Sequence, residues 1–408
     1  MISSVETVII GGGQAGMSVS YFLTKQNHPH LVLEQASQAG NAWRNHRWDS
    51  FTFVTPNWTI KLPGAEYAGN DPDGFMPRDE IVKYFENYIS KYNLPVHFNE
   101  KVLSVEKQNG SFTVTTDKNT YITQNVVMAT GSFQKPRIPE LSKNVPDNIK
   151  QLHFSEYRNP SQLPHGNVLV VGSAQSGCQI TEDLYKNGRK VYLSTGSVGR
   201  LPRKWRGKDI ICWLEKTGMF EQSVNELPSP AAKFSANPQI TGVGGGHTIN
   251  LHQFAKDGVV LLGRLKNIQK EMALFKADLI DNLKKIDSFE AEIIKFVDDY
   301  IDKSGLDVPE EILPDIRNGY DSEIITELDL HGSGITTIIW ACGFSFDYSI
   351  VKLPVFDEHG YPKHRRGITE FPGLYYVGLL WLTKAKSSLL YGVGEDAEFV
   401  ASDILNKR

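Results

Sequence analysis

The chain has 408 residues, enough for two or three domains, and an ordinary globular composition with a formal net charge of −4 at pH 7. This charge provides none of the basic surface that nucleic-acid binding needs, so nucleic acid is excluded as a partner. Its three cysteines lie far apart, no leader is recognised after Met1 and no apolar run has the length of a membrane span, so we expect a cytoplasmic protein without disulfides or membrane contact.

The stretch Glu6–Gly16 predicts a dinucleotide-binding turn. A β-branched apolar strand leads into Gly11, Gly13 and Gly16, and an amphipathic helix starts at once. The first glycine allows the tight turn, the second lets backbone N–H groups approach a pyrophosphate, and the third lets helix and strand pack closely. The phosphate would lie at the positive end of the helix. Glu34 ends the next strand and is placed to accept a hydrogen bond from a ribose hydroxyl; an ordinary glycine-rich turn is the weaker alternative.

Aromatic residues follow the first turn closely. Trp43 lies in the segment 40–44, which begins with a glycine, and the segment 48–58 is rich in tryptophan and phenylalanine; this combination suits the wall of a planar cofactor. For single members such as Trp48 and Trp58, an aromatic core beneath a loop is an equal alternative. A helix is then expected over 79–92, and strands over 95–98, 101–108, 111–116 and 121–128, the last of which runs into Ala129-Thr130-Gly131.

A second unit of the same kind is predicted over 168–195. Its first strand leads to Gly172, Ala174 stands in place of the middle glycine, and Gly177 begins the helix. A methyl group at the middle position is tolerated in some dinucleotide sites, so the prediction of a second nucleotide site holds.

The end of the second unit indicates which nucleotide it binds. Ser194 and Thr195 stand where the first unit has its carboxylate, and three cations follow soon after: Arg200, Arg203 and Lys204. Removing the acid and adding cations is how a site accepts a 2′-phosphate, so NADPH is favoured over NADH. A solvated basic loop is the alternative.

The rest of the chain does not continue the alternation of strands and helices. Residues 201–246 are irregular and rich in proline and glycine, which suits a lid or a substrate wall. Over 266–303 apolar residues follow helical spacing on a charged background, which predicts one or two inserted helices. Packing against the host is the plain interpretation of their apolar stripe, and a homodimer contact or an active-site cover are the alternatives. Strands are expected at 335–341 and 372–378, and a turn with a terminal helix over 387–405.

Two dinucleotide motifs, the second inserted within the first domain, resemble the two-dinucleotide-binding flavoproteins. Three further motifs are similar to those of class B flavoprotein monooxygenases, the flavin-containing monooxygenase group: Ala129-Thr130-Gly131 with Pro136, Ile339-Trp-Ala-Cys-Gly-Phe344, and Gly40-Asn-Ala-Trp43-Arg44. His153 and Tyr157 match the family's linker motif, whereas Asp147 and Ile149 occupy its Phe and Gly positions. Leu379 also follows Gly378 in place of the usual carboxylate. These departures and the helical insert resemble a bacterial subgroup described as flavin-dependent oxidoreductases.

The resemblance implies an α/β fold of two nested Rossmann-like, three-layer domains with a helical insertion. An FAD-binding domain would comprise 1–160 and 318–408, and an NADPH-binding domain 161–317 with its insert at about 266–304. The cofactor-binding residues of the first domain and the later strands would be Gly11, Gly13, Gln14, Ala15, Gly16, Glu34, Gln35, Trp43, Arg44, Val102, Ala129, Thr130, Gly131, Gly343 and Gly378. Those of the second would be Gly172, Ala174, Gln175, Ser176, Gly177, Ser194, Thr195 and Arg200, with NADH as an alternative to NADPH.

The same resemblance implies a reaction. Hydride passes from NADPH to FAD, dioxygen adds to the reduced flavin, and the resulting C4a-(hydro)peroxyflavin oxygenates a soft nucleophile, nitrogen or sulfur, of a small-molecule substrate. The family's asparagine near that intermediate has Val54 in its place here, so Asn57 is the nearest catalytic substitute. His153 is the second catalytic candidate; it is expected to orient the linker between the domains, or else to be a satisfied structural residue. Alternatives are an NADPH oxidase or electron-transfer reductase, and, less favoured, a non-catalytic redox-sensing flavoprotein; no metal site is predicted.

Overall fold

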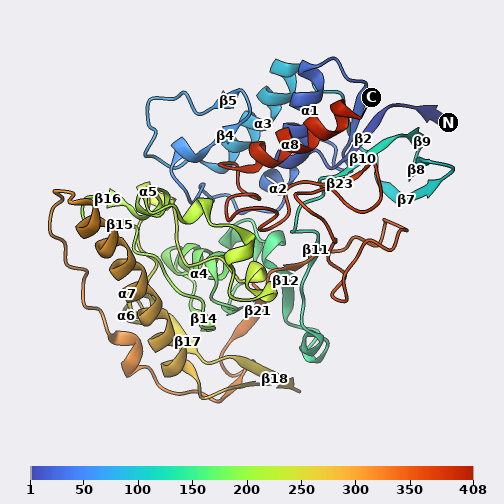
Figure 1. Ribbon diagram of the computed structural model, residues 1–408. Helices are drawn as coiled ribbons and strands as arrows, with labels where there is room; N and C mark the ends of the chain where they lie inside the picture. Colours follow the sequence, from blue (N-terminus) through green and yellow to red (C-terminus); the bar gives the residue numbers. More distant parts are fainter. Residues whose placement is uncertain (1, 408) are drawn as a thin grey trace.

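The computed structural model describes residues 2–407 and contains two α/β units, which lie one above the other in Figure 1. The first unit is built on a parallel sheet in the order β23-β10-β2-β3-β6. Its strands are β2 (Thr7–Ile10), β3 (His30–Leu33), β6 (Val96–His97), β10 (Asn125–Met128) and β23 (Leu374–Tyr376). Both termini belong to this unit, because β23 joins the sheet from the far end of the chain.

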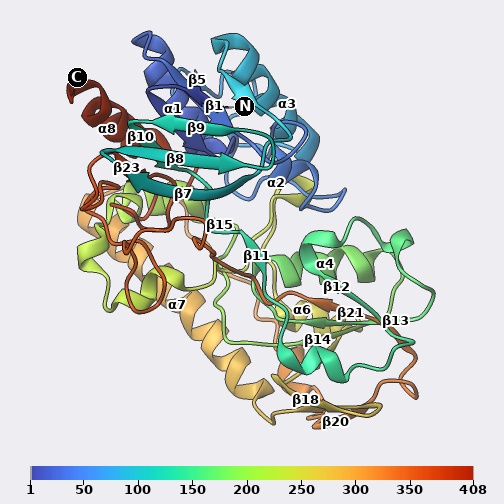
Figure 2. The ribbon, with the colours of Figure 1, turned by 90° about the vertical axis from the view of Figure 1, so that its right-hand side faces the viewer.

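Side-chain alternation gives the first parallel sheet two apolar faces. Ile9, Val32 and Val127 point toward the helices α1 (Gln14–Lys25), α3 (Arg78–Tyr92) and α8 (Val393–Asn406). The neighbouring residues Val8 and Ile10 point the other way, against an antiparallel layer of β7 (Val102–Gln108), β8 (Ser111–Thr116) and β9 (Thr120–Thr123). Figure 2 shows this antiparallel layer beside β10 and β23. The unit therefore has three layers, as predicted.

The second unit repeats the plan. Its parallel sheet has the order β12-β21-β13-β14-β17, with β12 (Lys150–His153), β13 (Asn167–Val171), β14 (Val191–Ser194), β17 (Val260–Leu262) and β21 (Ile335–Trp340). One face carries α4 (Gln175–Lys186) and α6 (Leu251–Lys256). The other packs against the antiparallel strands β18 (Leu265–Gln269), β19 (Met272–Phe275) and β20 (Glu327–Asp329). Two nested Rossmann-like domains are thus confirmed.

The strand partners correct the expected domain boundaries. The expected boundaries at 160 and 318 put β12 and β21 in the first domain. In the structure β12 pairs with β21, and β21 pairs with β13 of the second sheet, so both strands belong to the second unit. Similarly, the single strand expected over 121–128 is two strands in two different sheets, β9 and β10. Nothing in the local sequence of these short segments says which sheet receives each of them.

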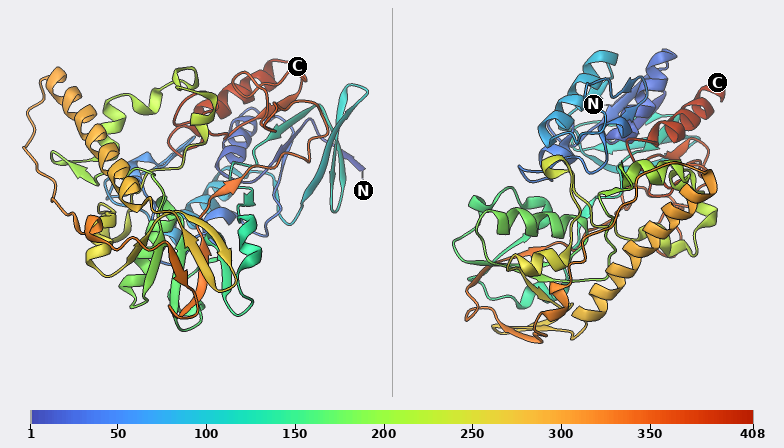
Figure 3. Two further views of the ribbon diagram at one scale, coloured as in Figure 1. Left: turned by 90° about the horizontal axis from the view of Figure 1, so that it is seen from below. Right: turned by 90° about the vertical axis from the view of Figure 1, so that its left-hand side faces the viewer.

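The insert is one helix rather than the expected helical region from 266. Residues 265–275 form the antiparallel pair β18–β19, and α7 (Leu279–Ser304) follows as a continuous helix along the outside of the second unit (Figure 3). Its apolar side is divided, because Leu283 and Ile286 join the core of the second sheet whereas Val297 and Ile301 join a separate core with Trp205. Packing against the host therefore accounts for most of the stripe.

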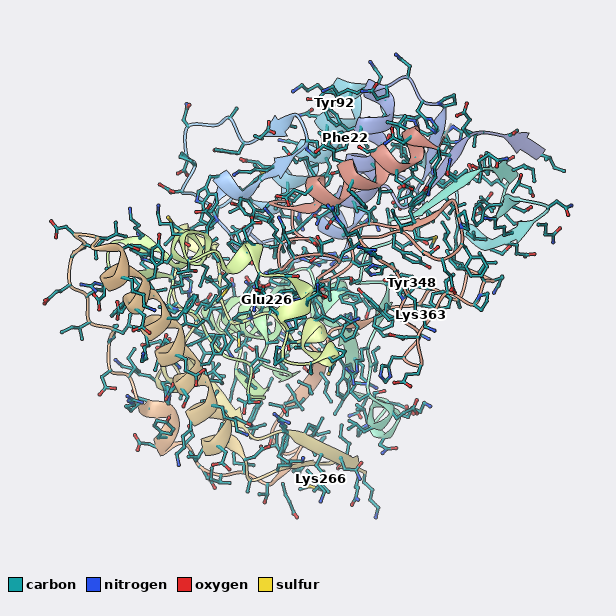
Figure 4. All side chains as sticks on the ribbon, viewed as in Figure 1. Phe22, Tyr92, Glu226, Lys266, Tyr348 and Lys363 are labelled. Atoms are coloured by element: carbon teal, nitrogen blue, oxygen red, sulfur yellow. The ribbon has the colours of Figure 1, made fainter. Side chains whose placement is uncertain are left out.

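The other elements are short. Helices α2 and α5 span Asn41–Arg44 and Ile210–Lys216, and the remaining strands are β1 (Ile2–Ser4), β4 (Lys61–Leu62), β5 (Ala65–Glu66), β11 (Lys135–Pro136), β15 (Lys204–Trp205), β16 (Lys208–Asp209) and β22 (Phe344–Ser345). Within residues 2–407, every helix is too short or too polar to cross a membrane. Figure 4 places Phe22 and Tyr92 in the first unit, Lys266 at the opposite end of the second unit, and Glu226 between them.

Candidate functional site

The first glycine-rich turn has the geometry that its spacing predicts. Gly11 has φ 110°, and a Cβ there would lie 2.5 Å from the carbonyl oxygen of Ala129 at the end of β10. A Cβ on Gly16 would lie 1.9 Å from the Gly11 carbonyl oxygen, so α1 can pack this close to β2 only with glycine. By contrast, a Cβ on Gly13 would meet nothing within 4 Å. The turn is therefore held tightly at both ends and open in the middle, where a phosphate would approach the N-terminus of α1.

Glu34 holds this turn from the end of β3. Its Oε2 accepts a hydrogen bond from the backbone N–H of Gly12 at 2.8 Å, and its Oε1 accepts one from Ala36 at 2.8 Å. Each carboxylate oxygen has a further lone pair, so a ribose hydroxyl can still be accepted. Gln35 is exposed just beyond it.

Other predicted cofactor residues gather at the same sheet edge. Gly378, which follows β23, has φ 79°, and a Cβ there would lie 2.5 Å from the Cβ of Ala15 in α1. The Gln14 side chain donates to the carbonyl of Ser388. Next to Ala129, Gln134 Nε2 donates to Thr130 Oγ1 at 2.6 Å and to the Gly131 carbonyl at 2.9 Å. The carboxyl ends of three parallel strands thus converge on the start of α1.

The predicted aromatic wall is partly built. The Trp43 ring, on α2, lies 5.8 Å from the ring centres of both Phe51 and Phe53, and the Arg47 guanidinium lies 5.3 Å from it. Arg44 points elsewhere and pairs with Glu86 of α3 at 2.6 Å. Val102 is buried among the residues between the two sheets of the first unit. Trp48 is fully buried, so the core interpretation is correct for that residue.

The second turn reproduces the first. Gly172 has φ 109° and a Cβ there would lie 2.6 Å from the Ala341 carbonyl oxygen; a Cβ on Gly177 would lie 1.9 Å from the Gly172 carbonyl oxygen. Ala174 caps α4 with φ −74°, close to the −84° of Gly13 at the same place in the first unit. An alanine fits there because neither residue needs a left-handed backbone. Gln175 and Ser176 follow in the first turn of α4 and are half-buried.

The ribose end of the second unit differs from the prediction. The Ser194 hydroxyl donates to the Gly263 carbonyl at 3.0 Å, and the Thr195 hydroxyl donates to the Leu262 carbonyl at 2.8 Å, so both are used within the sheet. Arg200 pairs with Asp287 at 2.6 Å and with Glu290 at 2.5 Å, both on α7, and its side chain is 7% exposed. Its charge is therefore neutralised by the insert and not offered to a phosphate.

An arginine that the sequence analysis missed lies at this edge. Arg264 follows β17, the parallel neighbour of β14, and its side chain is 48% exposed. Its Nη2 donates to Ser197 Oγ at 3.0 Å, and its only carboxylate contact among the described residues is Asp278 at 3.9 Å. The sequence shows a cation directly after a short apolar strand at this position. Arg264 is, however, about seventy residues from β14 along the chain, and only the pairing of β14 with β17 brings it to the end of β14.

His153 and Asn57, the predicted catalytic residues, lie in different settings. His153 ends β12, is buried, and is hydrogen-bonded through Nε2 to the Gly343 carbonyl at 2.9 Å and through Nδ1 to Ser155 Oγ at 2.8 Å. Burial lowers its pKa, so the ring is neutral at pH 7. Asn57 is buried too; its Nδ2 donates to the Asp71 carbonyl at 2.9 Å, and its Oδ1 has no hydrogen-bond partner among residues 2–407. His153 is thus a satisfied linker residue, and Asn57 retains one free acceptor.

No group of three or more His, Cys, Asp or Glu side chains within residues 2–407 is arranged to hold a metal ion. The thiols are also poorly suited to redox chemistry, because burial raises the pKa of Cys342 to about 11 and raises the pKa of Cys178 and Cys212 as well. What the two units share is a tight glycine-rich turn between the first strand and the first helix of each parallel sheet.

Comparison with known proteins agrees with this arrangement. Residues 8–227 match the family model described as pyridine nucleotide-disulphide oxidoreductase, and the chain belongs to this family of oxidoreductases. It is 35% identical over 98% of its length to the uncharacterized oxidoreductase CzcO-like of Geobacillus kaustophilus, of which the match covers 99%. The chain is thus a CzcO-like, flavin-dependent oxidoreductase, which confirms the predicted family and enzyme class.

Two further proteins are similar to this chain, one over half of the sequence and one in its fold. It is 28% identical over 205 residues, 49% of each chain, to the probable indole-3-pyruvate monooxygenase YUCCA1 of Arabidopsis thaliana. The solved structure of the flavin-containing monooxygenase of Stenotrophomonas maltophilia matches with a TM-score of 0.68 and 18% identity, covering 99% of both chains. This structural likeness shows that the two proteins share their fold.

Proposed function

We propose that this protein is an FAD- and NADPH-dependent monooxygenase-like enzyme that oxygenates a nitrogen or sulfur atom of a small molecule with dioxygen. The observation that carries the proposal is the repeated turn: Gly11 and Gly16 in the first unit, and Gly172 and Gly177 in the second, approach corresponding carbonyl oxygens at nearly the same distances. Two such turns in one chain fit two dinucleotides, one beside each sheet. The partial likeness to YUCCA1 supports the monooxygenase class.

The chain's own groups would bind and orient the cofactors. The first turn of α1 would hold the FAD pyrophosphate above Gly13, and Glu34 would accept from the adenosine ribose. The first turn of α4 would hold the second dinucleotide in the same way. Bound FAD supplies hydride acceptance and oxygen activation, and the protein positions and insulates it. Asn57, with its unpartnered Oδ1, is the side-chain acceptor we propose beside that cofactor.

The preference for NADPH rests on Arg264 in place of Arg200. Since Arg200 is neutralised by α7, the exposed guanidinium of Arg264 and the Ser197 hydroxyl are the groups that fit a 2′-phosphate next to β14. A guanidinium fork and a hydroxyl are well suited to a phosphate dianion.

The proposal is tested by following where oxygen goes. FAD-loaded protein is mixed with NADPH under 18O-labelled dioxygen and a panel of amines and sulfides, and NADPH consumed, hydrogen peroxide released and labelled product are measured together. We expect at least one substrate to lower the peroxide released per NADPH and to gain one labelled oxygen atom. Stoichiometric peroxide with every substrate would instead establish an NADPH oxidase.

A reductase without oxygenation is the second candidate. The half-kept linker motif favours it, because Asp147 and Ile149 stand at the family's Phe and Gly positions. Since none of the cysteines has a lowered pKa, such a reductase would pass electrons directly to an acceptor and not through a thiol. Anaerobic reduction of an added quinone or dye, faster than oxygen consumption, would identify it.

A further inference from the structure

A buried arginine joins the two units. Arg203 lies in the second unit after β14, is 2% exposed, and donates from Nη1 to the carbonyl of Val54 in the first unit at 2.9 Å. The same nitrogen lies 3.3 Å from the Thr241 carbonyl, and Nη2 donates to Asp209 Oδ1 at 2.5 Å. Its guanidinium carbon also lies 4.7 Å from the centre of the Phe75 ring. One side chain thus contacts both units at once.

The loop beside Arg203 is shaped for the same contact. A Cβ on Gly242, in the second unit, would lie 2.1 Å from the carbonyl oxygen of Phe53 and 2.8 Å from the Phe75 side chain. A Cβ on Gly246 would lie 2.7 Å from the Phe75 ring and 2.8 Å from Arg203 Cδ. Because Gly242 has an ordinary φ of −101°, its lack of a side chain serves the close approach and not the backbone conformation.

The segment that Arg203 holds carries the predicted flavin contacts. The Phe53 ring packs on Trp43 of α2, and Val54 stands where the resemblance places the family's asparagine. Asn57, with its unpartnered Oδ1, lies three residues further on. Contacts therefore run without interruption from the second unit, through residues 53 and 54, to the aromatic wall of the first.

We propose that Arg203 is a positioning residue that fixes segment 53–57 of the first unit against the second unit, so that the two bound cofactors meet in the geometry that hydride transfer needs. The identity of the cofactors rests on the proposed function, whereas the coupling of the segment to the second unit does not. Arginine suits this place because its planar fork donates to two carbonyls and a carboxylate in fixed directions, which a lysine ammonium cannot do.

The test compares Arg203→Lys and Gly242→Ala with the matched control Arg206→Lys. Arg206 lies just beyond Arg203, in the turn between β15 and β16, and is also paired, but its partners, Asp298 and the Pro309 carbonyl, both belong to the second unit. Two quantities are measured: amide hydrogen exchange of residues 53–58 in the protein without cofactors, and the rate of anaerobic flavin reduction by NADPH. FAD and NADPH dissociation constants are determined alongside.

In Arg203→Lys and Gly242→Ala, the two seam variants, we expect faster amide hydrogen exchange at residues 53–58. We also expect NADPH to reduce the flavin about 10- to 100-fold more slowly, because a displacement of about 1 Å has this effect on the rate of an oriented reaction. Cofactor dissociation constants and the control variant should match the wild type. Unchanged exchange and unchanged reduction in both seam variants would overturn the proposal, and so would an equal loss in Arg206→Lys. If exchange rises but NADPH fails to reduce even the wild-type protein, the proposed function is wrong while the coupling stands.

Discussion

Single atoms decide the geometry of the two glycine-rich turns. In each unit a Cβ on the helix glycine, Gly16 or Gly177, would collide with a carbonyl oxygen at 1.9 Å, whereas a Cβ on Gly13, the middle residue of the first unit, would meet nothing within 4 Å. Gly16 and Gly13 therefore have different tasks, the first in packing α1 against β2 and the second in leaving room for a ligand. Gly177 corresponds to Gly16, and Ala174 shows that a methyl group at the middle position is compatible with the fold.

This division predicts opposite effects of two similar substitutions. Gly16→Ala should destabilise the protein without cofactor by about 1–3 kcal/mol, because the added methyl forces helix and strand apart. Gly13→Ala should leave the thermal midpoint of that form unchanged and weaken FAD binding. Thermal unfolding without FAD, and an FAD titration, measure the two effects. Equal loss of stability in both variants would contradict the assignment.

At the same scale, Arg264 should determine the nicotinamide preference. Arg264→Ala should raise the KM for NADPH about tenfold or more and leave that for NADH unchanged, since a charge-assisted contact to phosphate is lost. Lys204→Ala, which removes an exposed cation predicted from the sequence to lie near the same site, serves as the control. Steady-state kinetics with both nucleotides decide the matter; an equal effect on NADH would rule out a 2′-phosphate contact.

Among the elements, α7 is fastened to the second unit by a polar network. Asp287 accepts from Arg200, from Tyr320 at 2.5 Å and from His252 at 3.2 Å, and Glu290 binds Arg200 as well. Burial alone raises the pKa of Asp287, but the hydrogen bonds from His252 and Tyr320 and the charge of Arg200 outweigh it, so the pKa lies well below its usual range. The ionised carboxylate of Asp287 thus holds α7 against the second unit through its hydrogen bonds to Arg200, His252 and Tyr320.

Because the folded-state pKa of Asp287 is lowered, its stabilising effect is complete above the unfolded value near 3.8, declines below that value, and is lost only as the pH falls through the lower folded-state pKa. Asp287→Asn should therefore lower the free energy of unfolding by about 3 kcal/mol at pH 7 and by clearly less near pH 2. Urea unfolding across this pH range measures the difference. Asp299→Asn, on the exposed side of the same helix, should have little effect at either pH.

Across the whole molecule, the two units, each with its own glycine-rich turn, meet at an interface that we call the seam. Besides Arg203, the seam contains Glu221, which pairs with Lys384 at 2.7 Å and also with Lys386, and residues 222–224 bond to the backbone of 383–385. The polypeptide crosses between the sheets more than once. It passes from β10 of the first sheet to β12 of the second, and it returns from β21 of the second sheet to β23 of the first. Each unit nevertheless keeps its own sheet and turn.

This arrangement predicts separate protection by the two cofactors. FAD alone should slow amide exchange in α1 and around Gly378, and NADP+ alone should slow it in α4, because each ligand stabilises the element it contacts. At 100 times its dissociation constant, each should stabilise its unit by about 2.7 kcal/mol. Hydrogen-exchange mass spectrometry with one ligand at a time is the measurement. Protection of α4 by FAD would reverse the assignment.

The amino-acid sequence by itself determined the paired turns. Strand, glycines, helix start and following carboxylate all lie within about thirty residues of one another, so local sterics and spacing define the βαβ unit. The tertiary structure decided everything that depends on distant partners. Strand pairing places β12 and β21 in the second sheet and brings Arg264 to the end of β14. Packing of α7 pairs Arg200 with Asp287, and the contact between the units lets Arg203 donate to the Val54 carbonyl. Burial and strand pairing select such partners only in the folded chain, because many segments carry the same apolar and cationic residues and no local pattern distinguishes them.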